Sequence, residues 1–439
     1  MGSALIQNVL GAELPNVDRA EGVWLFDTDG NRYLDGCSGA VVTSIGHSNP
    51  HVIEAMKNQA ERVTYIHRGA FASEATHHLA DRLADATGYA GVWFVNSGSE
   101  AVEAAMQFAL QYYREKGKER HWFLSQTKSY HGNTLGALSL SGHARRQVAG
   151  NLAYPFAELP APYLYREGEG LSDAEYADQL LEQAEQVIAE HADKLAGVIF
   201  EPVGGATLGS TVPPDAYVKG LRQLCDKYDV LLIADEVMTG LGRTGKLLGV
   251  DHWNVKPDLV AIGKGLGAGY TPIAGTLVNA KILETLTRGS GRILGGHTYA
   301  GNPLSIAIAS AVIDVLFQDD LIARAATTGK YLADGLRRLA DKHELIGDAR
   351  GLGMLHSVEF VQDKRTKEVL LPQGSLARRV ADAAMDEGLV IYVATGGFND
   401  ACQIAPALTI TVDEVDDLLA RLGRALSNVE QELGHHIES

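Results

Sequence analysis

The sequence predicts an α/β protein with a large, doubly wound, mostly parallel-sheet domain and a smaller α+β domain. Between about residues 75 and 280, short continuous apolar runs alternate with helical stretches. Continuous Val/Ile/Leu runs bounded by helices are typical of strands buried on both faces of a parallel sheet. After about residue 325, three long helical patterns are interleaved with shorter apolar runs, which is typical of a smaller mixed domain.

The elements follow in order along the chain. VWLFDTDGNRYLDG contains two strand-like runs around Asp29-Gly30, a dipeptide that favours a two-residue hairpin turn. The middle region then offers the strands GVWFVNS, HWFLSQ, LAGVIFEPV, VLLIADEV and PDLVAIG, with AVEAAMQFALQYYREK and YVKGLRQLCDKYD as intervening helices. The apolar run at 303–317 is too short to span a bilayer and predicts a buried helix. KYLADGLRRLADKHE, SLARRVADAAMDEG and VDEVDDLLARLGRALSNVEQEL are the three late helices.

Composition excludes several function classes. A formal net charge of −17 over 439 residues disfavours nucleic acid and anionic lipid as partners. Cys37, Cys225 and Cys402 are far apart and in no metal-ligand spacing, so we expect neither a disulfide scaffold nor a metal site. The N-terminal stretch has no basic segment followed by an apolar run, so no secretory signal is visible. We therefore expect a cytoplasmic protein that binds neither nucleic acid nor membrane.

The most informative stretch is KYDVLLIADEVMTGLGRTG, followed by PDLVAIGKGLGAG. Asp235 stands at the carboxyl end of one apolar strand and Lys264 just past the end of another, which is the ligand-binding edge of an open α/β sheet. A lysine there can form a Schiff base, and an aspartate can pair with a protonated pyridine nitrogen; pyridoxal phosphate (PLP) chemistry requires both groups. Taken singly, Asp235 is also explained as a turn cap and Lys264 as a solvated loop lysine.

A phosphate site is predicted at Ser97-Gly98-Ser99, where a strand ends and a helix begins. A helix N-terminus binds anions through its free backbone amides and its dipole, and the Ser99 hydroxyl is a further donor. In SYHGNT, Tyr130 offers an aromatic plane that can stack on a cofactor ring. A plain serine N-cap and a buried turn tyrosine explain the same residues without a cofactor.

Six motifs occur together in a fixed order: NSGSEAVEAA, SYHGNT, IFEPV, LLIADEVMTGLGRTG, DLVAIGKGLGAGYTPIAG and HTYAGNPLS. In this combination the sequence closely resembles the class III (ω-type) aminotransferases, a family of fold-type I PLP enzymes. The resemblance extends from the VWLFDTDGNRYLDG hairpin to APALTIT, nearly the whole chain. It implies a large PLP-binding domain at 61–325, a C-terminal small domain at 326–439, and an N-terminal segment, 1–60, that contributes to the small domain.

The resemblance also implies residue roles. Lys264 would be the Schiff-base lysine, and Asp235 would hold the proton on the pyridine nitrogen. Tyr130 and Val237 would cover the two ring faces, while Glu201 would help to place the substrate. Thr298 would complete the phosphate site of the neighbouring subunit, which makes a homodimer with shared active sites the expectation. The full expected set is Ser97, Gly98, Ser99, Tyr130, His131, Glu201, Asp235, Val237, Lys264 and Thr298; His131 is equally explained as a hydrogen-bonded turn histidine.

The activity implied is transamination with ping-pong kinetics, in which an amino group passes from an amine or ω-amino acid to a keto acid such as pyruvate. Lys264 would then serve as proton shuttle. Two alternatives stay open: a lyase, decarboxylase or aminomutase on the same scaffold, and a non-catalytic binder. The nucleotide-binding version of the latter is disfavoured because Gly263-Lys264-Gly265 fits neither GxGxxG nor a Walker-type loop.

One position departs from the family pattern. Many members carry an arginine before the tandem-proline segment near the C-terminus, where it binds a substrate carboxylate through paired hydrogen bonds. Gln403 stands there in this chain, which shifts the expected donor toward amines or ω-amino acids. Arg68, Arg145 and Arg146 are candidates for compensation, and each is also explained as a surface arginine. Arg243, in GLGRTG, is expected to form structural pairs rather than to contact substrate.

Overall fold

The computed structural model of the chain describes residues 4–370 and 372–434. Within these residues, the largest sheet has seven strands: β4 (Gly91–Val95), β5 (Trp122–Gln126), β6 (Glu158–Leu159), β7 (Leu195–Phe200), β8 (Leu231–Glu236), β9 (Leu259–Ile262) and β10 (Ala274–Val278). They lie in the order β4-β10-β9-β8-β7-β5-β6. All pairs from β9 to β6 are parallel, whereas β10 runs antiparallel to both of its neighbours. The predicted mostly parallel α/β architecture is confirmed.

Both faces of this sheet are buried, as the continuous apolar runs predict. Along β8, Leu231 and Ile233 belong to one apolar core while Leu232 and Ala234 belong to another, because successive side chains of a strand point to opposite faces. Helix α4 (Gly98–Glu115) covers the first face. Helices α8 (Asp173–His191) and α9 (Asp215–Lys227) contribute to the second core.

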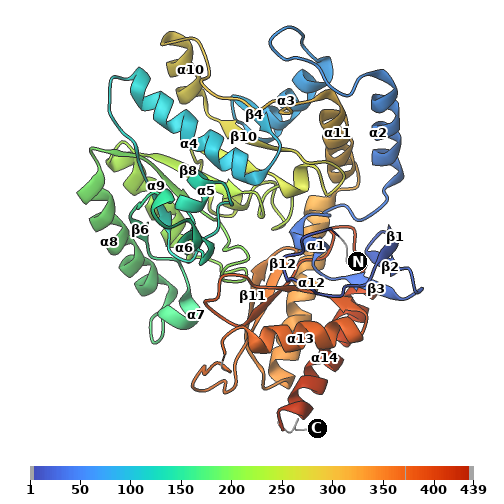
Figure 1. The fold of residues 1–439 in the computed structure, drawn as a ribbon. Coiled ribbons are helices and arrows are strands. Elements are labelled where there is room, and N and C mark those ends of the chain that lie inside the picture. The colour runs from blue at the N-terminus through green and yellow to red at the C-terminus, as the bar shows by residue number, and fades with distance from the viewer. Residues whose placement is uncertain (1–3, 371, 435–439) are drawn as a thin grey trace.

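Two further sheets are formed, within the described residues, by strands from the two ends of the chain. One contains β1 (Val17–Glu21), β2 (Trp24–Asp27), β3 (Arg32–Asp35) and β13 (Leu389–Val390), and the other contains β11 (Ile346–Leu352), β12 (Leu355–Phe360), β14 (Tyr392–Val393) and β15 (Ala401–Ile404). Strand β13 pairs in parallel with β3. In Figure 1 the blue N-terminal strands accordingly lie beside the orange and red C-terminal elements.

The late helical patterns form α12 (Leu321–Lys342), α13 (Ser375–Asp386) and α14 (Val412–Glu432), as predicted. The 303–317 run is the buried helix α11 (Pro303–Gln318), which starts with the Asn302 side chain accepting a hydrogen bond from Ser305 N. The remaining helices are α1 (Ser38–Val41), α2 (Pro50–Arg62), α3 (Glu74–Thr87), α5 (Leu135–Ser139), α6 (Arg145–Ala149), α7 (Leu164–Glu167) and α10 (Ala280–Arg288). Among the described helices, none combines the length and apolarity that crossing a bilayer requires.

The predicted N-terminal hairpin is present, but its loop is longer than the two residues that Asp29-Gly30 favours. Strand β2 ends at Asp27 and β3 begins at Arg32, which leaves four residues, 28–31, between them. The Asp27 carboxylate organises this loop, because its Oδ1 accepts hydrogen bonds from the backbone N–H groups of Asp29 (3.0 Å) and Asn31 (2.8 Å). A side-chain acceptor therefore sets the turn length in place of the dipeptide preference.

Replacement of Leu232 by alanine is expected to lower the free energy of unfolding by about 2–5 kcal/mol, because the side chain is fully buried on β8 and its loss leaves a cavity. Urea denaturation of the purified protein measures the change. The control is Leu152→Ala, whose side chain is 73% exposed and should change stability by no more than about 0.5 kcal/mol. Equal losses in the two variants would contradict the assigned burial.

Candidate active site

Polar side chains from the parallel strands meet at one edge of the large sheet. Asp235 is the penultimate residue of strand β8, and Glu201 directly follows β7. Tyr130 and His131 lie in the segment after β5, and Lys264 comes two residues after β9. Because the carboxyl ends of parallel strands share one edge, residues far apart in the sequence converge here. This is the edge at which the sequence predicts a ligand.

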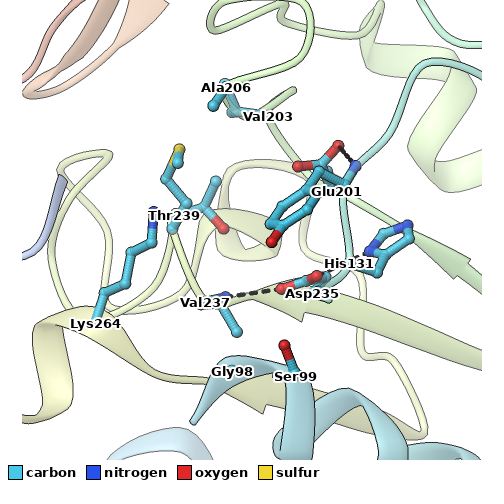
Figure 2. A pocket seen from close by; sticks show the side chains of 13 residues that line it. Gly98, Ser99, His131, Glu201, Val203, Ala206, Asp235, Val237, Thr239 and Lys264 are labelled. Atoms are coloured by element: carbon cyan, nitrogen blue, oxygen red, sulfur yellow. Dashed lines mark hydrogen bonds and ion pairs between the residues drawn. The ribbon is translucent and has the colours of Figure 1, made fainter. Parts of the chain in front are cut away.

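These residues surround a cavity of about 210 Å³. Figure 2 shows Lys264 on one side, His131 on the other, Asp235 between them, and Gly98 and Ser99 at the start of a helix below. Of the residues that the sequence predicts for the site, those that line the cavity are Gly98, Ser99, Tyr130, His131, Glu201, Asp235, Val237 and Lys264. The structure therefore brings together groups from five separate segments. Ser97 and Thr298 are not among the described lining residues.

The N-terminus of α4 forms one end of the cavity. Ser97 caps this helix, since its hydroxyl accepts a hydrogen bond from Glu100 N at 3.2 Å. The first amides of a helix have no partner within it, so the N–H groups of Gly98 and Ser99 are available to an anion. A side chain at position 98 would not fit: its Cβ would lie 2.8 Å from Val237 Cγ1. Glycine thus lets the helix start close to Val237.

Asp235 is held by two hydrogen bonds and is only 7% exposed. Its Oδ1 accepts from Val237 N at 3.0 Å, and its Oδ2 lies 2.8 Å from His131 Nδ1. Because a carboxylate can only accept, the His131 ring donates from Nδ1. Sequence reasoning placed His131 near the cofactor but missed this pairing. The one indication in the sequence is that both residues come at the carboxyl ends of strands in the same sheet.

The Lys264 side chain is half-buried, and the burial of its amine lowers the pKa to about 8, although the nearby Asp235 carboxylate favours the charged form. Its Nζ donates a hydrogen bond to the carbonyl oxygen of Ala40 at 2.9 Å. That carbonyl belongs to α1, so the N-terminal part of the chain also reaches the site. The amine therefore loses its proton more readily than an ordinary lysine amine does.

Glu201 is a second carboxyl group in the cavity wall, and its side chain is half-buried. Burial raises its pKa to about 7, against a lowering effect of His131. Its Oε1 accepts from Gly205 N at 3.1 Å, and its Oε2 accepts from Tyr130 N at 3.4 Å. Glu201 therefore fixes the backbone that carries Tyr130 at the cavity.

Thr298 lies on an exposed segment and does not line the cavity of its own chain. This segment carries exposed large apolar side chains of its own. Tyr299 is 66% exposed and Leu294 is 56% exposed, and the Tyr299 ring contacts that of Tyr65 with 5.8 Å between centroids. Phe71 is also exposed, six residues after Tyr65 in the sequence. We call the side chains of Tyr65, Phe71, Leu294 and Tyr299 the apolar patch.

Gln403 is buried on β15 and does not line the cavity. Its Nε2 donates to Ser210 Oγ at 3.4 Å and contacts the Met238 sulfur at 3.7 Å. Arg243 is also buried, and its Nη1 donates to backbone carbonyls, including that of Pro406 at 2.5 Å. Its expected structural pairing is thus with the main chain of the C-terminal segment.

Comparison with known proteins agrees with this site. The family model described as Aminotransferase class-III matches residues 9–426. The aminotransferase YodT of Bacillus subtilis (strain 168) is 39% identical over 99% of this chain and 99% of its own. A taurine–pyruvate aminotransferase of Bilophila wadsworthia is 34% identical, and the match covers 95% of this chain and 93% of that protein.

Solved structures show the same fold. An amine transaminase from an uncultivated Pseudomonas species, in its PLP-bound form, has a TM-score of 0.91 at 33% identity, with 98% of both chains covered. The expected fold-type I architecture is confirmed by this likeness together with the mostly parallel sheet. The chain therefore belongs to the class III aminotransferases and is a PLP-dependent enzyme of that family.

Proposed function

We propose that this enzyme moves an amino group from an amine or ω-amino acid to a keto acid such as pyruvate, by a ping-pong mechanism. The observation that carries the proposal is that the Lys264 amine, the Asp235 carboxylate and the free N-terminus of α4 face one cavity. A ping-pong reaction needs a single site that both substrates use in turn. The name of the taurine–pyruvate relative supports pyruvate as the acceptor.

The cavity fits PLP. The amides of Gly98 and Ser99 would hold a phosphate, and the missing Cβ of Gly98 lets the start of the helix lie close to Val237. Asp235 suits a protonated pyridine nitrogen, while Tyr130 and Val237 offer an aromatic and a branched apolar surface for the two ring faces. Lys264 supplies the amine that bonds the cofactor. His131 keeps Asp235 in place through the 2.8 Å contact.

When bound, PLP acts as an electron sink that acidifies the C–H bond next to the substrate nitrogen. Asp235 would hold the proton on the ring nitrogen, because its carboxylate is fixed at the cavity by Val237 N and His131 Nδ1 as a hydrogen-bond acceptor. Lys264 Nζ, with its pKa lowered to about 8, removes a proton from the substrate carbon as base and returns it as acid. Val203, Val237 and Met238 form apolar parts of the wall and exclude water from these transfers.

We further propose a homodimer in which Thr298 of each subunit reaches the phosphate of the other. The support is that Thr298 lies on an exposed segment next to the apolar patch, where large side chains are left uncovered by the described residues. Such patches mark interaction surfaces. We also propose that residues 61–325 form the large domain and that residues 1–60 join 326–439 in the small domain. The pairing of β3 with β13 supports this division.

The two half-reactions test the function directly. The visible absorption band of the lysine-bound cofactor should bleach when 1-phenylethylamine is added and return when pyruvate follows, because amine and keto acid use the same cavity in turn. Lys264→Ala should still hold PLP but show neither change. Lys219→Ala, an exposed lysine on α9, is the control and should behave as the unchanged protein. Full turnover by Lys264→Ala would refute the assignment, and product release without recovery by pyruvate would favour a lyase.

The rate at which cofactor-free protein takes up PLP should depend on the ionisation of Lys264. Only the neutral amine attacks an aldehyde, and burial lowers the pKa of Lys264 to about 8. The rate should therefore rise about tenfold per pH unit below that value and level off above it. Stopped-flow absorbance from pH 6 to 10 measures this, with N-acetyllysine amide in solution as the comparison. A protein rate that keeps rising in parallel with the free lysine would contradict a lowered pKa.

Mixed dimers test the role of Thr298. Thr298→Ala alone should weaken PLP binding by about tenfold, the usual worth of a hydrogen bond to a charged group. A mixed dimer of one Lys264→Ala and one Thr298→Ala subunit has a single intact lysine site, completed by the other subunit's threonine. That site should regain the affinity of the unchanged protein. Continued weak binding would place Thr298 in the site of its own chain.

A further inference from the structure

The cavity has too little positive charge for a substrate that carries a carboxylate. A keto acid and an ω-amino acid both carry one. Asp235 and Glu201 are in the wall, and Lys264 is the only lysine or arginine among the described lining residues. In the proposed function, Lys264 acts at the amino group of the substrate and is not available to bind its carboxylate. A substrate carboxylate beside the Asp235 and Glu201 carboxyl groups is stabilised by a further cation, and a cation outside the lining would stand at the rim.

Gln403 does not meet this need. Its amide is neutral and buried on β15, and its Nε2 is directed at Ser210 Oγ and the Met238 sulfur. Met238 stands between it and the cavity lining, since Met238 lines the cavity and Gln403 does not. A cation must come from another segment.

Arg145 is the guanidinium that contacts a lining residue. Its Nη1 lies 3.5 Å from Tyr130 Oη, and its central carbon lies 5.7 Å from the centre of the Tyr130 ring. The side chain is exposed and forms no ion pair with any carboxylate that the structure describes. Its backbone is held near Tyr130, because Arg145 N donates to His143 Nδ1 at 3.0 Å and the His143 ring packs edge-on against Tyr130.

The other candidate arginines, Arg68 and Arg146, contact residues that do not line the cavity. Arg146 Nη1 donates to Glu158 at 2.8 Å, and its Nη2 donates to the Tyr154 carbonyl at 3.1 Å. Arg68 lies over the ring of Trp93 at 5.2 Å, and Trp93 is not a lining residue. Of these three arginines, Arg145 is thus the one whose guanidinium contacts a residue of the cavity wall.

We propose that Arg145 binds the carboxylate of the substrate, both the distal carboxylate of an ω-amino acid donor and that of the keto-acid acceptor. Tyr130 positions the guanidinium at the rim, where it can offer two parallel N–H donors. The inference rests on the proposed transaminase function and names its substrate class: compounds that present an anionic group at the rim while the amine or keto carbon lies near Lys264. Amines without a carboxylate bind without Arg145.

Each half-reaction is measured separately in Arg145→Gln, with Arg146→Gln as the matched control on the same helix. For 4-aminobutyrate and for pyruvate, the concentration giving half-maximal rate should rise by about 10- to 100-fold in Arg145→Gln, as expected for lost charge-assisted hydrogen bonds. With 1-phenylethylamine, both variants should remain within about twofold of the unchanged protein. Arg145→Lys should recover part of the loss, since it keeps the charge without the planar fork.

A binding readout accompanies the kinetics. Pentanoate has a carboxylate but no reactive group, and NMR titration should show weaker binding to Arg145→Gln than to Arg146→Gln. Unchanged half-saturation for both carboxylate substrates would overturn the role of Arg145, and so would an equal loss with 1-phenylethylamine, which would mean that the change acts through Tyr130. If the unchanged protein showed neither half-reaction, the proposed function would fail and this inference with it; an active protein indifferent to Arg145→Gln would overturn this inference alone.

Discussion

The parallel pairing of β5, β7, β8 and β9 is the constraint on which the site depends, because it brings the ends of separate chain segments to one edge. Each strand is buried on both faces, so its register is fixed by two cores at once. A slip of one residue along β8 would exchange those faces and carry Asp235 away from His131. The precision of a few polar contacts is thus set by apolar packing along the whole sheet.

The cavity is electrically polarised. Asp235 and Glu201 supply negative or titratable carboxyl groups in its wall, while the start of α4 supplies the positive end of a helix dipole. Such a field favours a ligand that is cationic at one end and anionic at the other. A protonated pyridine carrying a phosphate has this distribution of charge. Burial strengthens the effect, because the same groups in water would be screened.

Much of this arrangement follows from the sequence. Continuous apolar runs predict the buried strands, and the positions of Asp235 and Lys264 after two of them predict the site. Local patterns failed where a distant or side-chain contact decides the outcome. The hairpin loop has four residues because the Asp27 carboxylate accepts hydrogen bonds from it. The antiparallel direction of β10 depends on its pairing with β9 and β4, which are distant from each other in the sequence. No motif distinguishes Arg68, Arg145 and Arg146 as candidates for binding a carboxylate, since the distinction depends on which guanidinium the fold brings to the cavity wall.

The pairing of β3 with β13 has a consequence for synthesis of the chain. Leu34 and Leu389 are neighbours in one sheet, yet almost the entire polypeptide separates them. During translation, β3 is made early, and the edge that later pairs with β13 stays unpaired until β13 leaves the ribosome. An unpaired strand edge can pair with another chain instead. The large sheet, whose strands are all made in between, can assemble meanwhile. Completion of this small sheet is therefore a late event. A ribosome that stalls before residue 389 leaves a chain that contains Lys264 but exposes the unpaired edge of β3.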